Sequence, residues 1–85
     1  MTIRVLYFAW FREKVGMASE DVVLPTAVRT VAELVAWLKD RNTGHAAAFA
    51  DPSVVRVAVN QEYVKLDHAV KPGDEVAFFP PVTGG

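Results

Sequence analysis

The sequence predicts an α+β fold in which a mixed β-sheet carries one main helix packed on one face. Several short segments alternate apolar and polar residues with the period of strands, and one longer segment repeats apolar residues at helical spacing. The chain has 85 residues, 52% of them hydrophobic, which suffices for one compact domain and leaves no room for a second. We assign this domain to residues 1–81 and expect residues 82–85 to form a flexible tail.

The N-terminal part predicts a β-hairpin. Residues 3–11 are dense in β-branched and aromatic side chains on both faces, which is typical of a strand inside a sheet. Residues 12–19 are largely polar and contain Gly16, so we expect a turn there. A second strand is predicted at residues 22–24, ahead of Pro25, and is expected to pair with the first.

The main helix is predicted to begin at Thr30. The run from Thr30 to Glu33 matches the capping-box pattern, in which the two side chains satisfy each other's backbone N–H groups. Residues 42–44 are expected to stop this helix, and residues 45–50 to add at most a short helical turn. Apolar residues recur on one helical face, as expected for a helix that lies on a sheet: Val31, Leu34, Val35 and Leu38.

Three further strands are predicted in the C-terminal half. Residues 55–59 and 75–79 alternate in the manner of half-buried strands, and residues 63–65 form a short partner. The turn at residues 71–74 contains a proline and a glycine, both of which favour turns. Pro80 ends the last strand because it lacks an N–H donor. The predicted order is β-β-α-β-β-β.

The strands are expected to separate their side chains between two faces, because one helix covers only one face of the sheet. The face against the helix is predicted to hold Ile3, Val5, Tyr7, Val55, Val57, Val59, Val76 and Phe78. The open face is predicted to present Leu6, Phe8, Ala58, Ala77 and Phe79. So apolar an open face favours a protein-binding surface.

Composition argues against several classes of function. The formal net charge is −1 and the basic residues are scattered, so we expect no nucleic-acid partner. No apolar run reaches the length of a membrane span and the N-terminus lacks a signal-peptide layout, so we expect a cytoplasmic protein with no membrane partner. Cysteine is absent, which excludes thiolate chemistry and disulfides. We expect His45 and His68 to be solvated loop residues, no metal site, and no catalytic constellation.

The C-terminal segment PPVTGG, residues 80–85, is the one biased stretch. Its two prolines stiffen the exit from the last strand. Two terminal glycines bury no side chain and lose the most entropy on ordering, so they are poor for packing but suit a tail that threads a narrow channel. We therefore predict that Gly85 carries a reactive carboxylate that ATP can activate, and that Thr83 and Gly84 thread the tail into a partner's active site.

Longer motifs extend this signal over most of the chain. They are FAWFREKVG at residues 8–16, TVAEL at 30–34, VNQ at 59–61, KPGD at 71–74, and DEVAFFPPVTGG at 74–85. Together these runs resemble the family of molybdopterin synthase small subunits, the sulfur carriers of molybdenum cofactor biosynthesis. Residues 42–53 match no pattern of that family. The resemblance implies a ubiquitin-like β-grasp fold, consistent with the order of elements above.

The resemblance also implies a chemical role. An E1-like activating enzyme would use ATP to adenylate Gly85, a sulfurtransferase system would convert the adenylate to a thiocarboxylate, and the sulfur would pass to cyclic pyranopterin monophosphate in the large synthase subunit. The chain would bind no cofactor permanently and would be a non-catalytic, sulfur-donating subunit of a heterotetramer. In this family the open sheet face docks the partners, which maps partner binding onto Phe8, Tyr63, Phe79, Pro80, Pro81 and Val82.

The sequence leaves three alternative functions open. A sulfur carrier of thiamine biosynthesis shares the diglycine end but lacks the aromatic and proline context of residues 78–83. A protein modifier would join Gly85 to lysines of other proteins through isopeptide bonds. A non-covalent ubiquitin-like interaction module would use its surface only, and its tail would have no chemistry.

Overall fold

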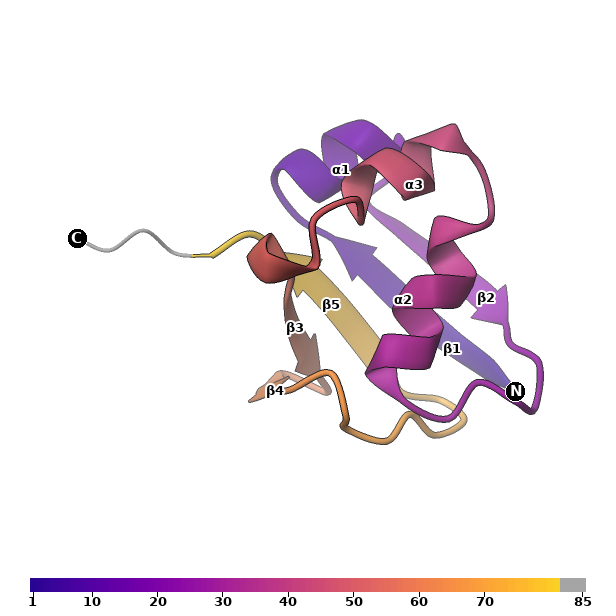
Figure 1. The fold of residues 1–85 in the computed structure, drawn as a ribbon. Coiled ribbons are helices and arrows are strands. Elements are labelled where there is room, and N and C mark those ends of the chain that lie inside the picture. Colours follow the sequence, from indigo (N-terminus) through magenta and orange to yellow (C-terminus); the bar gives the residue numbers. More distant parts are fainter. Residues whose placement is uncertain (82–85) are drawn as a thin grey trace.

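A five-stranded sheet is the framework of the domain in the computed structural model, which describes residues 1–81. The spatial order is β2-β1-β5-β3-β4, and β1 and β5 lie side by side in its interior (Figure 1). Strands β1 and β5 are parallel, whereas the other pairs are antiparallel, so the sheet is mixed as predicted. The strands are β1 (Thr2–Tyr7), β2 (Ser19–Val23), β3 (Arg56–Val59), β4 (Glu62–Val64) and β5 (Glu75–Phe79).

The helices lie on one face of the sheet (Figure 1). The main one, α2 (Val31–Lys39), begins with the predicted capping box: the Thr30 hydroxyl accepts from the Glu33 N–H at 3.2 Å, and the Glu33 carboxylate accepts from the Thr30 N–H at 3.1 Å. Two short helices, α1 (Trp10–Val15) and α3 (Thr43–Ala48), and a 3-10 turn (Pro52–Val54) complete the element order. This arrangement is the ubiquitin-like β-grasp, which confirms the predicted fold class.

The prediction of one strand over residues 3–11 is wrong, because β1 ends at Tyr7 and residues 10–15 form α1. Ala9 has φ 53° and ψ −129°, a backbone conformation that ends the strand and turns the chain into the helix. The helix then places Phe11 in the core with no exposed surface, and Gly16 stops it in the left-handed region at φ 90°. Core packing of Phe11 therefore overrides the strand propensity of this aromatic run.

The region after the main helix also differs from the prediction. Helix α2 ends at Lys39, and residues 42–44 do not simply stop it: the Asn42 side chain accepts from the His45 N–H at 2.9 Å and so caps the start of α3. The predicted short helical segment is confirmed, but it spans Thr43–Ala48 and so begins before residue 45. Strand β2 begins at Ser19 rather than at residue 22, and β4 occupies Glu62–Val64 rather than residues 63–65.

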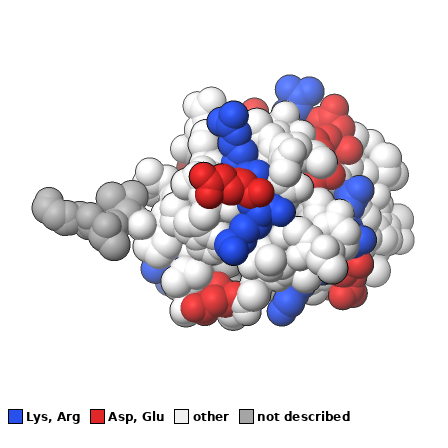
Figure 2. Space-filling view, turned by 90° about the horizontal axis from the view of Figure 1, so that it is seen from above, with Lys and Arg blue, Asp and Glu red and all other residues white. Residues whose placement is uncertain are grey.

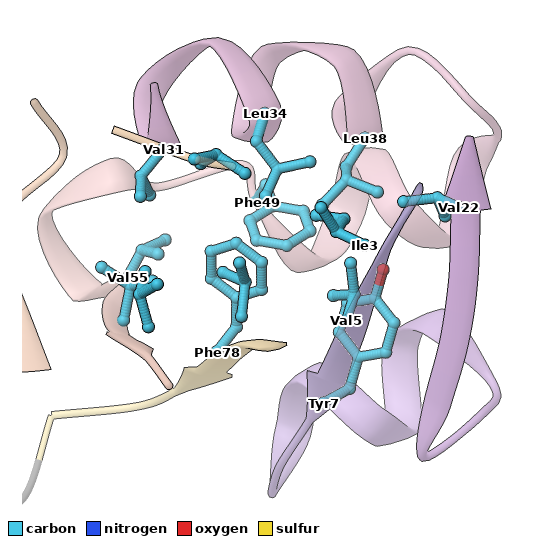
Figure 3. Close-up of a cluster of buried hydrophobic side chains, with 14 of the residues drawn as sticks. Ile3, Val5, Tyr7, Val22, Val31, Leu34, Leu38, Phe49, Val55 and Phe78 are labelled. Atoms are coloured by element: carbon cyan, nitrogen blue, oxygen red, sulfur yellow. The ribbon is translucent and has the colours of Figure 1, made fainter. Parts of the chain in front are cut away.

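The core lies between the sheet and the helices. Leu34 and Leu38 of α2 point toward the sheet, and Phe49 lies over Phe78 (Figure 3). The rings of Phe49 and Phe78 pack edge to face with centroids 4.9 Å apart. The predicted buried face is confirmed, because these side chains are all buried: Ile3, Val5, Tyr7, Val55, Val57, Val59, Val76 and Phe78.

We predict that Phe78→Ala lowers the free energy of unfolding by about 3–5 kcal/mol, since it removes a fully buried ring from the centre of this core. Urea unfolding followed by circular dichroism measures the change. Phe79→Ala, on the opposite face of the same strand, is the matched control and should cost clearly less. Equal losses for the two variants would contradict the assignment of the faces.

We also predict that Gly44→Ala destabilises the protein by about 1–3 kcal/mol, as expected for overpacking. A methyl group built on Gly44 would lie 2.5 Å from the carbonyl oxygen of Lys14, where α1 and α3 meet. Helix propensity alone predicts the opposite sign, a gain of about 1 kcal/mol. Thermal unfolding decides between them, with Thr43→Ala in the same helix as the control.

Candidate functional site

The open face of the sheet carries an apolar strip that crosses four strands. Register places Leu6 of β1 opposite Ala77 of β5, Ala77 opposite Ala58 of β3, and Ala58 opposite Tyr63 of β4. Residues paired in this way point to the same side of a sheet. The strip is therefore continuous from β1 to β4 and lies on the face that the helices leave free.

Two aromatic rings form the prominent part of this strip. Tyr63 is 83% exposed, and its ring packs against the half-buried Phe79 with centroids 5.5 Å apart. Ala58 lies between their two strands and is only 6% exposed. The sequence prediction that Ala58 contributes apolar surface to this face is therefore wrong. Ala58 lies on this face, between Ala77 and Tyr63 in register, but it is almost fully buried there.

Phe8 lies at the end of the strip where β1 finishes. Its N–H donates to the carbonyl of Phe78 at 3.1 Å, which places it beside the end of β5. Its side chain is 50% exposed, and the positive φ of Ala9 turns the following chain away into α1. The ends of β1 and β5 thus bring Phe8 and Phe79, two of the predicted contact residues, to the same end of the sheet.

The chain leaves the sheet at this end. Pro80 and Pro81 follow Phe79 directly and are half-buried. The other predicted site residues lie outside the described residues: Val82, Thr83, Gly84 and Gly85. The described part of the site therefore consists of an apolar strip that includes three exposed or half-exposed rings, and of the two prolines that begin the exit.

The opposite end of the open face is polar. Arg4 donates to Asp21 at 3.0 Å, and this hydrogen bond and the charge of Arg4 hold the pKa of Asp21 below its usual value. Both side chains are well exposed, so the pair is expected to add little to stability. A shallow hollow here is lined by Thr2, Ile3, Arg4, Asp21, Gly73 and Glu75. The open face is thus divided into an apolar exit end and a charged end.

One residue of the open face, Arg56, was not predicted from the sequence. Arg56 is exposed and lies in register with Phe79, on the same face. Its guanidinium donates to the backbone carbonyls of Ser53 and Val55 at 3.0 and 3.2 Å, which holds it near the β3 edge. The alternation that places Ala58 on the open face also places Arg56 there, so this signal was present in the sequence.

The prediction that His45 is a solvated loop residue is also wrong. His45 is 1% exposed and lies between Glu20 and Asn42, whereas His68 is exposed as expected. Within residues 1–81, no three His, Cys, Asp or Glu side chains gather closely enough to hold a metal ion. In that same part of the chain, no helix is long and apolar enough to cross a membrane.

Charged side chains of both signs are interspersed over the surface that Figure 2 shows, where Lys and Arg alternate with Asp and Glu. No broad patch of one sign covers that view. A mixed surface of this kind gives little long-range attraction for a polyanion. The face in that view therefore offers no charged surface suited to a polyanion.

Comparison with known proteins identifies the family. The model of the ThiS family matches residues 5–85. The chain belongs to the ThiS family. It is 46% identical to the molybdopterin synthase sulfur carrier subunit of Escherichia coli strain K12, over 98% of this chain and 99% of the relative. The resemblance drawn from the sequence motifs is thereby confirmed.

Solved structures of similar proteins share the fold of this ThiS-family chain. A putative molybdopterin converting factor, subunit 1, from Pyrococcus furiosus has a TM-score of 0.79 and 36% identity, covering 96% of this chain and 99% of that one. The crystal structure of SAMP1 from Haloferax volcanii has a TM-score of 0.74 and 26% identity, over the full length of both chains. Related structures describe SAMP1 as a small archaeal modifier protein.

Proposed function

We propose that this protein is the sulfur carrier of molybdenum cofactor biosynthesis and the small subunit of a molybdopterin synthase. The observation that carries the proposal is the 46% identity to a molybdopterin synthase sulfur carrier subunit over nearly the full length of both chains. The sequence ends in Gly84-Gly85, as a carrier with a reactive terminal carboxylate requires. The open sheet face supplies the contact surface that such a carrier needs.

The proposed chemistry takes place at the Gly85 carboxylate. A carboxylate is a poor acyl donor, because its negative charge repels nucleophiles and its carbon bears no good leaving group. An E1-like enzyme removes this obstacle: a Gly85 oxygen attacks the α-phosphorus of ATP, pyrophosphate leaves, and an acyl-adenylate forms. A sulfurtransferase system then supplies sulfur at the oxidation level of sulfide, this sulfur attacks the acyl carbon, AMP leaves, and a thiocarboxylate results. In this scheme ATP is a substrate of the activating enzyme, and the carrier holds no permanent cofactor.

The proposed acceptor of the sulfur is cyclic pyranopterin monophosphate in the large synthase subunit. The glycines of the tail lack Cβ atoms, so a narrow active-site channel can close around their backbone. Two rounds of transfer would supply the two dithiolene sulfurs. The carrier itself would contribute a reactive group and a docking surface, and the large subunit would contribute the catalytic side chains. We propose a heterotetramer with two copies of each subunit.

The apolar strip is the proposed docking surface for the large subunit and for the activating enzyme. Its rings, Phe8, Tyr63 and Phe79, are the kind of aromatic anchors that contribute most to protein interfaces. They lie at the end of the sheet from which the chain continues toward Gly85, so docking there would direct the tail to the partner's active site.

A protein modifier is the second candidate, because the fold and length match those of SAMP1. A modifier would form isopeptide bonds between Gly85 and lysines of other proteins. Immunoblots of a cell lysate would then show a ladder of high-mass conjugates that a chain lacking Gly85 does not form. The hypothesis of a molybdopterin synthase sulfur carrier predicts instead that the chain remains at its own mass and co-purifies with a large subunit.

We predict that Phe79→Ala weakens binding to the large subunit at least tenfold, which corresponds to about 1.4 kcal/mol or more, as for truncation of an interface anchor. Isothermal titration calorimetry with the purified large subunit measures the change. Leu66→Ala is the control. Leu66 is a partly exposed apolar residue in the loop after β4, away from the strip, and its carbonyl accepts the Ala32 N–H at the start of α2. Equal effects of the two variants would contradict the docking assignment.

We predict that deletion of Gly85, or extension of the chain by one residue, abolishes sulfur transfer and leaves the unfolding temperature unchanged within about 1 °C. The core cluster of the described residues extends from Ile3 to Phe78, and a terminal glycine has no side chain to bury, so we expect Gly85 to add little to stability. Formation of molybdopterin in a reconstituted synthase measures activity. Sulfur transfer by the shortened chain would contradict the proposal.

A further inference from the structure

A buried polar cluster lies on the helix side of the sheet, opposite the docking strip. His45 of α3 is 1% exposed, and its Nε2 lies 2.7 Å from Oε2 of Glu20 on β2. The Tyr7 hydroxyl of β1 donates to the same carboxylate oxygen at 2.7 Å. The other ring nitrogen, Nδ1, lies 2.9 Å from the side-chain oxygen of Asn42. The cluster thus joins two strands to α3.

The hydrogen-bond partners determine where the protons lie. The Asn42 side-chain oxygen also accepts the His45 backbone N–H at 2.9 Å, so rotating the amide would place a donor against a donor. Nδ1 must therefore donate to it. Burial raises the pKa of Glu20, but hydrogen bonds from His45 and Tyr7 and the charge of Arg41 outweigh burial and hold the pKa below its usual value. Independently of His45, the Tyr7 hydroxyl donates to Glu20 Oε2 at 2.7 Å and the Arg41 guanidinium lies 3.4 Å from Oε1, so Glu20 is an ionised acceptor and Nε2 donates to it as well.

We propose that His45 is an imidazolium that forms a buried ion pair with Glu20, and that this pair positions Tyr7 and, through it, the exposed Phe8 at the end of β1. The inference goes beyond the proposed function, because it requires neither sulfur chemistry nor a particular partner. His45 and Glu20 are positioning residues in this account: neither belongs to the docking strip.

Tyr7 lies between the His45–Glu20 ion pair and Phe8. Tyr7 is almost fully buried. Its ring packs edge to face on the His45 ring, with centroids 5.9 Å apart, and stacks on the Phe78 ring, with centroids 6.4 Å apart. Tyr7 is the last residue of β1, and Phe8 follows it before the chain turns at Ala9. Only the Tyr7 side chain and one peptide bond therefore separate the pair from Phe8.

The charged and titratable groups around the pair come from several elements. Strand β1 contributes Tyr7, and the segment after α2 contributes Arg41, whose guanidinium lies 3.4 Å from Glu20 and 5.0 Å from the centre of the Trp37 ring. Helix α1 meets α3 through the Lys14 carbonyl at Gly44. Among residues 1–81, no side chain of α1 forms an ion pair with the cluster.

The direction of the pH effect follows from Glu20. Its pKa in the folded protein is lower than its ordinary value of 4.5, so the folded state binds this proton more weakly than the unfolded state does. The stabilisation from Glu20 is therefore present above pH 4.5 and is lost as the pH falls through the folded-state pKa. Glu20→Gln removes this contribution at every pH.

The protonation state can be observed directly by ¹⁵N NMR of the imidazole rings at neutral pH. We expect both His45 nitrogens to carry protons in the wild-type protein, and Glu20→Gln to leave one of them unprotonated. His68 is exposed and serves as an internal reference in the same sample. One unprotonated His45 nitrogen in the wild-type protein would overturn the proposal.

The positioning role requires a second set of measurements on the same full-length chain. Glu20→Gln, His45→Gln and the double variant form a thermodynamic cycle of urea midpoints. We expect the double variant to lose less than the sum of the single losses, and the difference between wild type and Glu20→Gln to shrink on acidification below pH 4.5. Additive losses, or a difference independent of pH, would overturn the ion pair.

Tyr7→Phe keeps the ring and removes only the hydroxyl, so it tests the connection to Phe8 even if a charge variant does not fold. We expect it to shift the amide signal of Phe8 in a ¹H–¹⁵N spectrum. Asp21→Asn is the matched control, because it breaks an exposed ion pair in the same strand as Glu20 and should leave that signal in place. An unchanged Phe8 signal in Tyr7→Phe would overturn the positioning role.

Discussion

The alternation of side chains along β5 is the constraint on which the rest of the structure depends. This strand lies between β1 and β3, so Phe78 faces the core while the adjacent Phe79 faces the open side. If the pairing of β5 slipped by one residue, its core side chains would move to the open face and its open-face side chains to the core. Contacts with both neighbouring strands fix the register. On β1, Val5 pairs with Val76; at the β3–β4 turn, the Asn60 side chain donates to Asp74 and accepts from the Glu75 N–H, both at 3.0 Å.

Much of the fold could be predicted from sequence because its signals are local. The capping box at Thr30 and the alternation around residues 55–59 and 75–79 each specify their own element, and the buried face follows from parity. The end of β1 could not be predicted in this way. The aromatic run after Tyr7 is compatible with a strand, and only the core position for Phe11 and the backbone turn at Ala9 convert it into α1. His45 was missed because its partner Glu20 is 25 residues away.

The candidate site was predictable to the extent that it depends on the same alternation. Parity placed Phe79 on the open face, the family resemblance added Tyr63, and the structure brings their rings together. Exposure was harder to predict, since Ala58 shares the face and is covered. Arg56 was overlooked although it lies in register with Phe79. The two faces thus support separate proposals: the open one carries aromatic anchors, and the covered one holds the ionic cluster that fixes the end of β1.

Whether Gly85 carries sulfur can be tested on the intact mass of the protein. The purified chain is incubated with a competent activating enzyme, a sulfurtransferase, a sulfur source and ATP, and compared with a sample that lacks ATP. If Gly85 carries sulfur, the mass rises in the presence of ATP by one oxygen-to-sulfur exchange, located in the peptide that ends at Gly85. No ATP-dependent change, under conditions in which the same enzymes modify a known carrier, would contradict it and favour a non-covalent interaction module.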